Sequence, residues 1–243
     1  MKKITAYGKS DIGKKRSSNQ DSILVNDKLG LYAVADGMGG HKGGETASSM
    51  ALDVLNTAVG KITDKKGSIQ VAPFLKEAIS LASMKIYERS LMDESLRGMG
   101  TTLVALFFDD GNAYIAQVGD SRVYLYRDGD LWKITEDHSL INEQIRSGLI
   151  TRQEAEKLTY KNVITRSVGF EEMVSVDVYT REVDPGDMFL LCSDGLTSML
   201  SDEDIKKAID SGSNISESVD KLINKANDAG GADNISVILL KVE

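Results

Sequence analysis

The sequence predicts an α+β fold in which mainly antiparallel β-sheets are covered by α-helices. Short runs of β-branched and aromatic residues indicate strands, and the pairs Asp110-Gly111 and Asp128-Gly129 supply tight turns between neighbouring runs. Longer stretches have apolar residues at spacings of three and four, which is typical of amphipathic helices. Because hairpins join antiparallel strands, whereas parallel strands need long crossovers, a doubly wound parallel sheet is not expected.

The helices are expected early in the chain and near its end. The first covers Glu45–Val59, and the second follows around Leu75–Ile86, each with one apolar face. A third surrounds Val219–Ala226 near the end of the chain. A short helix should begin at Ser201, because Asp204 three positions later completes a pattern similar to a capping box.

The strands are expected between and after these helices. They are predicted at Ser22–Val25, Leu31–Ala35, Thr102–Phe108, Ala113–Val118, Arg122–Arg127, Val174–Tyr179, Met188–Cys192 and Ile235–Val242. The chain has only 2 prolines and no Gly/Ser-rich linker. We therefore expect residues 1–243 to form one domain.

The composition excludes several classes of protein. With 41% hydrophobic and 27% charged residues, the chain is expected to be globular rather than disordered. A net charge of −8, with no run of Lys and Arg, argues against nucleic-acid binding. No apolar run approaches the roughly 20 residues of a membrane-spanning helix, and no signal-peptide core follows Met1. The lone Cys192 suits a buried thiol in a reducing compartment, so we expect a cytoplasmic protein without membrane insertion.

Several aspartates stand at the ends of predicted strands. Asp36, Asp120 and Asp194 follow apolar runs, Asp233 precedes the last one, and Asp21 precedes the first. If these carboxylates gathered in space, each pair would repel by about 4 kcal/mol at ~4 Å and an effective dielectric of ~20. Either a cation neutralises them or they lie apart. Oxygen ligands without clustered His or Cys favour a hard ion, Mg²⁺ or Mn²⁺.

A glycine-dense segment, residues 36–44, precedes the first long helix. Such a segment at a helix start can bind phosphate through backbone N–H groups. The P-loop and dinucleotide patterns do not fit, because no Gly-Lys-Ser/Thr follows and the helix does not lead to a parallel strand. The glycines are better explained by close approach of the backbone to an ion or ligand.

Seven short motifs occur in order along nearly the whole chain. They are Arg16–Asp21, Ala35–Gly40, Met99–Thr102, Val118–Arg122, Ile164–Gly169, Ser193–Gly195 and Gly231–Ile235. In these motifs the chain resembles the metal-dependent serine/threonine protein phosphatases of the 2C type, the PPM family, and particularly their compact bacterial members. The resemblance implies two antiparallel sheets stacked between helix pairs, in α-β-β-α layers, with a binuclear Mn²⁺/Mg²⁺ centre at one end.

The resemblance also assigns metal ligands in this sequence. Asp36 would bridge both ions, and the Gly37 carbonyl would help to hold one of them. Asp194 and Asp233 would hold the other ion. Asp120, together with Asp194, is similar to the pair that supports a third, weaker ion in bacterial members of the family.

The remaining catalytic assignments concern phosphate, water and a proton. Arg16 matches the phosphate-binding arginine, whose planar fork can donate two parallel hydrogen bonds. Asp21 would act mainly through metal-bound water. A water activated by the two ions would attack phosphorus, so that no protein nucleophile is needed. Many relatives have His directly after the Asp-Gly pair, where this chain has Met38. Either metal-bound water or His41 would then protonate the leaving alkoxide.

The resemblance implies hydrolysis of phosphoserine and phosphothreonine in proteins, opposing a bacterial Ser/Thr protein kinase. We expect a monomer, with residues 137–168 forming a flap beside the active site. Two other interpretations stay open: a catalytically inactive relative that acts as a scaffold, and a phosphatase confined to one regulatory protein. The complete aspartate set argues against the scaffold. A phosphatase confined to one regulatory protein usually has an added sensory domain, for which 243 residues are expected to leave no room.

Replacing His41 by Ala tests its role as general acid. The variant should have a lower kcat mainly for substrates with poor leaving groups, because these need a proton on the departing oxygen. Rates would be compared for a phosphopeptide and for p-nitrophenyl phosphate, whose leaving group needs no proton. An unchanged kcat for the phosphopeptide would exclude His41 as the general acid.

Overall fold

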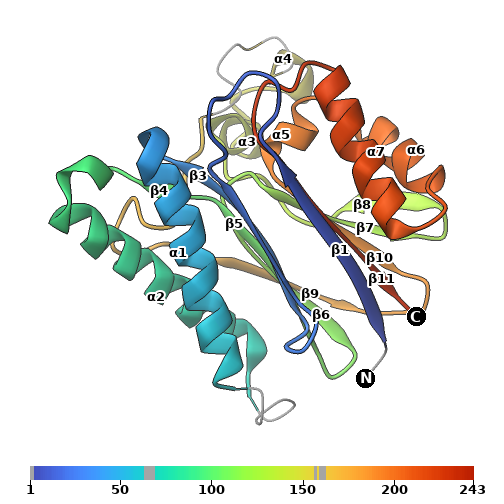
Figure 1. The fold of residues 1–243 in the computed structure, drawn as a ribbon, viewed down its shortest axis with the longest axis horizontal. Coiled ribbons are helices and arrows are strands. Elements are labelled where there is room, and N and C mark those ends of the chain that lie inside the picture. Colours follow the sequence, from blue (N-terminus) through green and yellow to red (C-terminus); the bar gives the residue numbers. More distant parts are fainter. Residues whose placement is uncertain (1–2, 63–68, 156–157, 159–162) are drawn as a thin grey trace.

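The structure, a computed structural model, describes residues 3–62, 69–155, 158 and 163–243. Two antiparallel sheets are stacked face to face, and helices cover both outer faces (Figure 1). This arrangement confirms the α+β class and the α-β-β-α layers. No helix among the described residues has both the length and the apolar character needed to cross a bilayer.

The first sheet contains the first and the last strand of the chain. In spatial order its strands are β1 (Ile4–Asp11), β11 (Ile235–Val242), β10 (Met188–Cys192), β7 (Arg122–Arg127) and β8 (Asp130–Lys133). The second sheet has the order β2 (Asp21–Asn26), β3 (Leu31–Met38), β5 (Leu103–Asp109), β6 (Asn112–Val118) and β9 (Asp177–Glu182). The short β4 (Gly100–Thr101) pairs with the end of β3. Neighbouring strands within each sheet are antiparallel.

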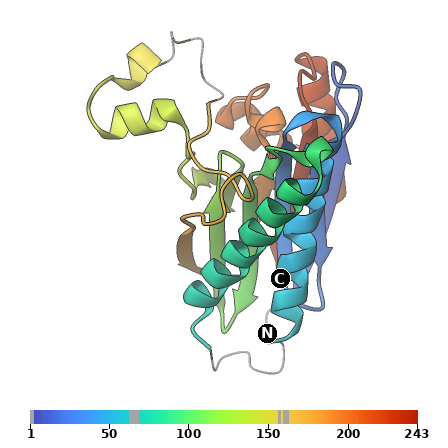
Figure 2. The same cartoon turned by 90° about the vertical axis from the view of Figure 1, so that its left-hand side faces the viewer.

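The helices form two layers and one projection. The second sheet is covered by α1 (Gly40–Gly60) and α2 (Val71–Met92), with the short 3₁₀ helix η2 (Glu94–Leu96) after them. The first sheet is covered by α5 (Asp194–Thr197), α6 (Asp202–Asp210) and α7 (Ile215–Asp228). The remaining helices, α3 (Leu140–Arg146) and α4 (Arg152–Ala155), project from one end of the sandwich (Figure 2).

Each interface between layers is an apolar core. Ile79 of α2 packs in the cluster between α1, α2 and the second sheet. Between the sheets, Phe108 and Phe189 meet edge to face with ring centroids 5.8 Å apart. Leu222 of α7 belongs to the third cluster, which fills the space above the first sheet. These three closely packed cores hold the ends of the strands, where the aspartates lie, in fixed positions.

Most predicted elements are confirmed, and the differences have local causes. The first helix begins at Gly40 rather than at Glu45, because the chain turns at Gly39 (φ 112°) within a segment that has no apolar periodicity. The strand predicted at Val174–Tyr179 lies at Asp177–Glu182, where β6 supplies its hydrogen-bond partners, while Val174 packs against the first core cluster.

The sequence prediction omits β1 and β8, the two edges of the first sheet. Edge strands face solvent and carry polar residues, so their apolar pattern is weak. The predicted turns are confirmed, since Asp110, Gly111, Asp128 and Gly129 all have positive φ between 44° and 82°. Two consecutive positive φ values are typical of the type I′ turn of a β-hairpin.

Candidate active site

Four aspartates from distant parts of the chain line one cleft of about 410 Å³ at the end of the sandwich. They are Asp36, Asp120, Asp194 and Asp233, and the same cleft is lined by Gly37 and Arg16. Asp21 lies behind them, opposite Asp36 in the pairing of β2 with β3. The structure therefore brings the predicted carboxylates together rather than scattering them.

The backbone around Asp36 is held by two threonine hydroxyl groups. The Asp36 N–H donates to Oγ1 of Thr102 over 3.0 Å. Its carbonyl oxygen accepts a hydrogen bond of 2.9 Å from Oγ1 of Thr101. Because both threonines are buried, these bonds fix the end of β3 and with it the direction in which the Asp36 carboxylate leaves the sheet.

Two glycines allow backbone segments to meet at the cleft. A Cβ atom on Gly37 would overlap the carbonyl oxygen of Gly44 in α1. A Cβ atom on Gly195 would overlap the carbonyl oxygen of Asn234, which precedes β11. The Gly after each Asp is therefore required for close packing, so these Asp-Gly pairs differ from the hairpin pairs, which serve turn geometry.

The cleft is an electrostatically unfavourable place for carboxylates. Burial holds the pKa of Asp36 well above its ordinary value, and the neighbouring Asp21 and Asp194 add to this rise. Burial also raises the pKa of Asp21 to about 6 and that of Asp120 to about 7. The pKa of Asp194 is raised too, by burial and then by the charge of Asp233. The cluster therefore favours protons or other cations over free carboxylates.

Two carboxylate oxygens in this cluster are buried without a hydrogen-bond partner. They are Oδ1 of Asp21 and Oδ1 of Asp194. The other oxygen of Asp21, Oδ2, accepts a hydrogen bond of 2.8 Å from the buried Ser193 hydroxyl. A buried charged oxygen left without a partner is costly unless a cation or water satisfies it.

These observations test whether the residues fit a divalent cation. In the described ranges, no three His, Cys, Asp or Glu side chains form a closed ligand set for a metal ion. Four carboxylates instead line the walls of one cleft and repel one another, and Asp194 among them has a buried oxygen without a partner. Oxygen donors of this kind suit Mg²⁺ or Mn²⁺. The donor set therefore fits the predicted metals.

Arg16 lies at the mouth of the cleft, in the loop between β1 and β2. Its Nη2 atom contacts Oδ2 of Asp233 at 2.6 Å, and 51% of its side chain is exposed. The loop is held by Asn234, whose Nδ2 donates to the carbonyl oxygens of Ile12 and Ser18. Asn234 belongs to the Gly231–Ile235 motif, but the sequence alone predicts no role for it, because its partners lie more than 200 residues away.

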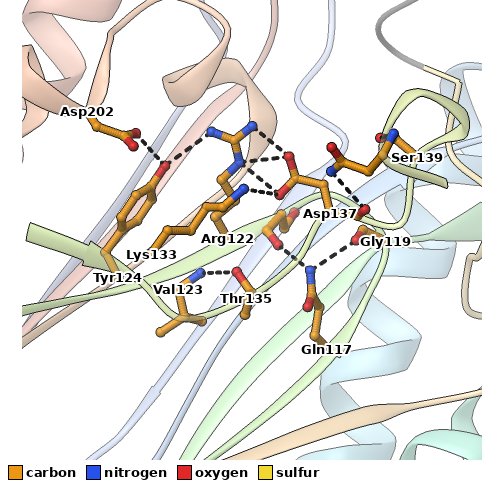
Figure 3. Close-up of polar contacts among 12 residues, drawn as sticks. Gln117, Gly119, Arg122, Val123, Tyr124, Lys133, Thr135, Asp137, Ser139 and Asp202 are labelled. Atoms are coloured by element: carbon orange, nitrogen blue, oxygen red, sulfur yellow. Dashed lines mark hydrogen bonds and ion pairs between the residues drawn. The ribbon is translucent and has the colours of Figure 1, made fainter. Parts of the chain in front are cut away.

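The loop that carries Asp120 is supported by a charged network (Figure 3). The guanidinium of Arg122 donates to both oxygens of Asp137 over 2.6 to 3.1 Å. Arg122 also donates to the hydroxyl of Tyr124, which in turn donates to Asp202. Because Asp137 is the first residue of the predicted flap, this network joins the flap to the Asp120 loop.

His138 makes a second connection at the same place. Its Nδ1 atom accepts a hydrogen bond of 3.1 Å from the N–H of Gly119, so Nε2 carries the proton that faces Asp177. Burial lowers the pKa of His138, which keeps the ring neutral. The sequence alone predicts no role for His138. The predicted general acid, His41, has its side chain outside the described part of the structure.

Known proteins and a family model match this chain over nearly its whole length. The family model for protein phosphatase 2C matches residues 8–239. The chain is 39% identical to the serine/threonine phosphatase stp of Listeria innocua, over 96% of this chain and 94% of that protein. The structure of the S. agalactiae serine/threonine phosphatase is similar with a TM-score of 0.91 and 37% identity, over 99% of this chain and 100% of that one. The catalytic domain of the phosphatase PstP, solved with 2 manganese ions, has a TM-score of 0.84 and 34% identity over 98% of both chains.

Replacing Asp36 by Asn should stabilise the metal-free protein at pH 8. An aspartate whose pKa is higher in the folded than in the unfolded state holds extra protons when folded. The metal-free protein therefore loses stability as the pH rises from about 4 to about 7, and the amide removes one of the repelling charges. The free energy of unfolding in urea and EDTA should rise by about 1–3 kcal/mol at pH 8 and by less at pH 5.

The control for this measurement is Asp53→Asn, which changes an exposed aspartate of α1 by the same chemistry. It should leave the free energy of unfolding within about 0.5 kcal/mol of the wild type. A less stable Asp36→Asn protein at pH 8 would contradict the repulsion argument.

Proposed function

The chain is a serine/threonine phosphatase of the protein phosphatase 2C family, and we propose that the cleft lined by the four half-buried aspartates is its active site. The observation that carries this proposal is the placement of Arg16 beside four carboxylates in one cleft. The carboxylates can hold divalent cations, and the guanidinium can hold the phosphate of a phosphoserine or phosphothreonine. Both kinds of group are needed to transfer a phosphoryl group to water.

In this proposal the ligands divide between two neighbouring ions. Asp36 would help to hold both, the Gly37 carbonyl would contribute to one, and Asp194 and Asp233 would hold the other. Asp120 and Asp194 would support a further, weaker ion. When bound, such ions supply an activated water as nucleophile and positive charge against the phosphate oxygens. The orphan oxygen of Asp194 and the raised pKa values of the cluster support this assignment.

Asp21 has a different place in the proposal, because it lies behind Asp36 rather than on the cleft wall. Its Oδ2 atom is held by Ser193, which leaves the orphan Oδ1 to accept a hydrogen bond from water in the metal site. Asp21 would therefore orient water without touching an ion directly.

Arg16 would bind the phosphate of the substrate. Its guanidinium contacts Asp233 in the structure, and this carboxylate is one that the proposal assigns to an ion. If Asp233 holds an ion, the fork of Arg16 would be free to donate two parallel hydrogen bonds to a phosphate. His41 remains the candidate general acid on sequence grounds, since the thioether of Met38 in the cleft has no proton to donate.

The cellular setting is also a proposal. The substrates would be phosphoproteins, and the enzyme would oppose a Ser/Thr protein kinase, acting as a monomer. Cys192 is fully buried, and burial raises the pKa of its thiol to about 12, so the thiol is unreactive in a reducing cytoplasm.

Hydrolysis of p-nitrophenyl phosphate should require Mn²⁺ and stop in EDTA. Asp36→Asn should lower kcat by about 10²–10³-fold or more at saturating Mn²⁺, because the residue shared by both ions is lost. Asp53→Asn, the exposed control, should keep wild-type turnover. Turnover that is equal with Mn²⁺ and with EDTA would refute the metal-dependent mechanism, and no turnover at all would favour a binding scaffold.

Replacing Arg16 by Ala should lower kcat/KM for a phosphothreonine peptide by about 10–100-fold, because charge-assisted hydrogen bonds to phosphate are lost. Arg16→Lys should recover only part of this loss, since an ammonium group lacks the planar fork. Inhibition by inorganic phosphate should weaken in parallel with kcat/KM. If phosphate inhibits all three proteins equally, Arg16 does not bind the phosphoryl group.

A further inference from the structure

A second hollow lies next to the active-site cleft and shares part of its wall. It has a volume of about 340 Å³ and is formed by the segment that runs from Ile164, in the last part of the predicted flap, to Ser175, just before β9. Ile164 lines both this hollow and the cleft that contains Arg16 and the aspartates. We call the hollow the side pocket. A peptide that extends from the cleft past Ile164 would therefore reach the side pocket.

Large apolar side chains are exposed at the side pocket. Phe170 and Met173 line it and are 59% and 82% exposed. Val163, which directly precedes Ile164, is 46% exposed. Single exposed apolar residues are ordinary, but several within one short segment beside a hollow are typical of a surface that contacts a partner.

The segment that forms the side pocket is firmly attached to the body of the molecule. The backbone of Val168 exchanges hydrogen bonds of 2.8 and 2.9 Å with Thr101. The hydroxyl of Ser83 in α2 accepts from the N–H of Gly169 and donates to the carbonyl oxygen of Glu171, both over 2.9 Å. Figure 2 shows this loop beside α2. The hollow is therefore preformed, and Phe170 and Met173 are exposed without being needed for its attachment.

The same contacts align the side pocket with the metal centre. Thr101 bonds Val168 through its backbone, and through its hydroxyl it donates to the carbonyl oxygen of Asp36. A single buried residue thus connects the segment to the aspartate at the centre of the cleft. A ligand that occupies both concavities would meet them at a fixed separation, which favours binding by avoiding the cost of ordering a loop.

The charges around the side pocket favour an apolar ligand over an acidic one. The only guanidinium among its lining residues, that of Arg166, already contacts Oδ1 of Asp177 at 3.2 Å. Glu171 also lines the pocket and would repel an acidic side chain. An apolar side chain gains contact with Phe170 and Met173 without displacing an ion pair.

We propose that the side pocket is a substrate subsite, which binds a bulky apolar side chain located a few residues from the phosphorylated serine or threonine. The occupant is a segment of the substrate protein, because the side pocket is continuous with the cleft where the phosphate would bind. This inference rests on the proposed function of that cleft. Burying one such side chain should raise kcat/KM by about 10-fold relative to a substrate with a small polar residue at that position.

The test uses phosphothreonine peptides in which one Leu is moved through the positions on either side of the phosphothreonine, against a Ser-only reference. The wild type should show kcat/KM about 10-fold higher for Leu at one position than for the reference. The double variant Phe170→Ala/Met173→Ala should lose this preference. Its ratio of kcat/KM for the Leu peptide to kcat/KM for p-nitrophenyl phosphate should fall by about the same factor.

Trp132→Ala is the matched control, because Trp132 is also 59% exposed but lies on β8, outside the side pocket. It should leave both the preference and the ratio unchanged. Circular dichroism and thermal unfolding of the variants would exclude misfolding as the cause.

Three outcomes would overturn the proposal. The wild type could show no preferred Leu position, or the double variant could keep the wild-type preference. Alternatively, the double variant could change only the oligomeric state seen by light scattering, which would assign the surface to a second copy of this chain. Metal-dependent turnover of p-nitrophenyl phosphate by the wild type separates these failures from failure of the proposed active site.

Discussion

The pairing of β2 with β3 imposes the constraint on which the candidate active site depends. This register sets the buried Asp21 opposite the half-buried Asp36, which lines the cleft at the end of the sandwich. The antiparallel pair β10–β11 brings Asp194 and Asp233 to the same end from the other sheet. Strand geometry thus forces like charges together, at a cost in stability that the apolar layers must offset and that divalent cations would remove.

Neutral polar side chains keep this repulsion from opening the cleft. Thr101 and Thr102 hold the backbone of Asp36, and Ser193 holds one oxygen of Asp21. Asn234 fixes the loop of Arg16 by donating to two carbonyl oxygens and accepting from the Gln20 N–H. These groups add no charge to the cluster, so they position the carboxylates without changing its net charge.

A second region of the fold links the cleft to the surface that a protein substrate would meet. Arg122 with Asp137, and Gly119 with His138, tie the start of the predicted flap to the loop of Asp120. At the other end of the predicted flap, the backbone of Thr165 donates to the carbonyl oxygen of His138. The two ends of the segment are therefore joined to each other and, through Arg122 and Gly119, to the loop that carries Asp120.

Local patterns in the sequence were sufficient for the fold class, for most elements and for the choice of the candidate aspartates. Apolar runs such as Met188–Cys192 and Ile235–Val242 coincide with strands because buried strands leave a strong local signal. Tertiary structure alone decided the start of α1, the edge strand β1 and the supporting roles of Asn234 and His138. These features depend on partners distant in sequence, such as β11 for β1, and periodicity within one segment contains no information about such partners.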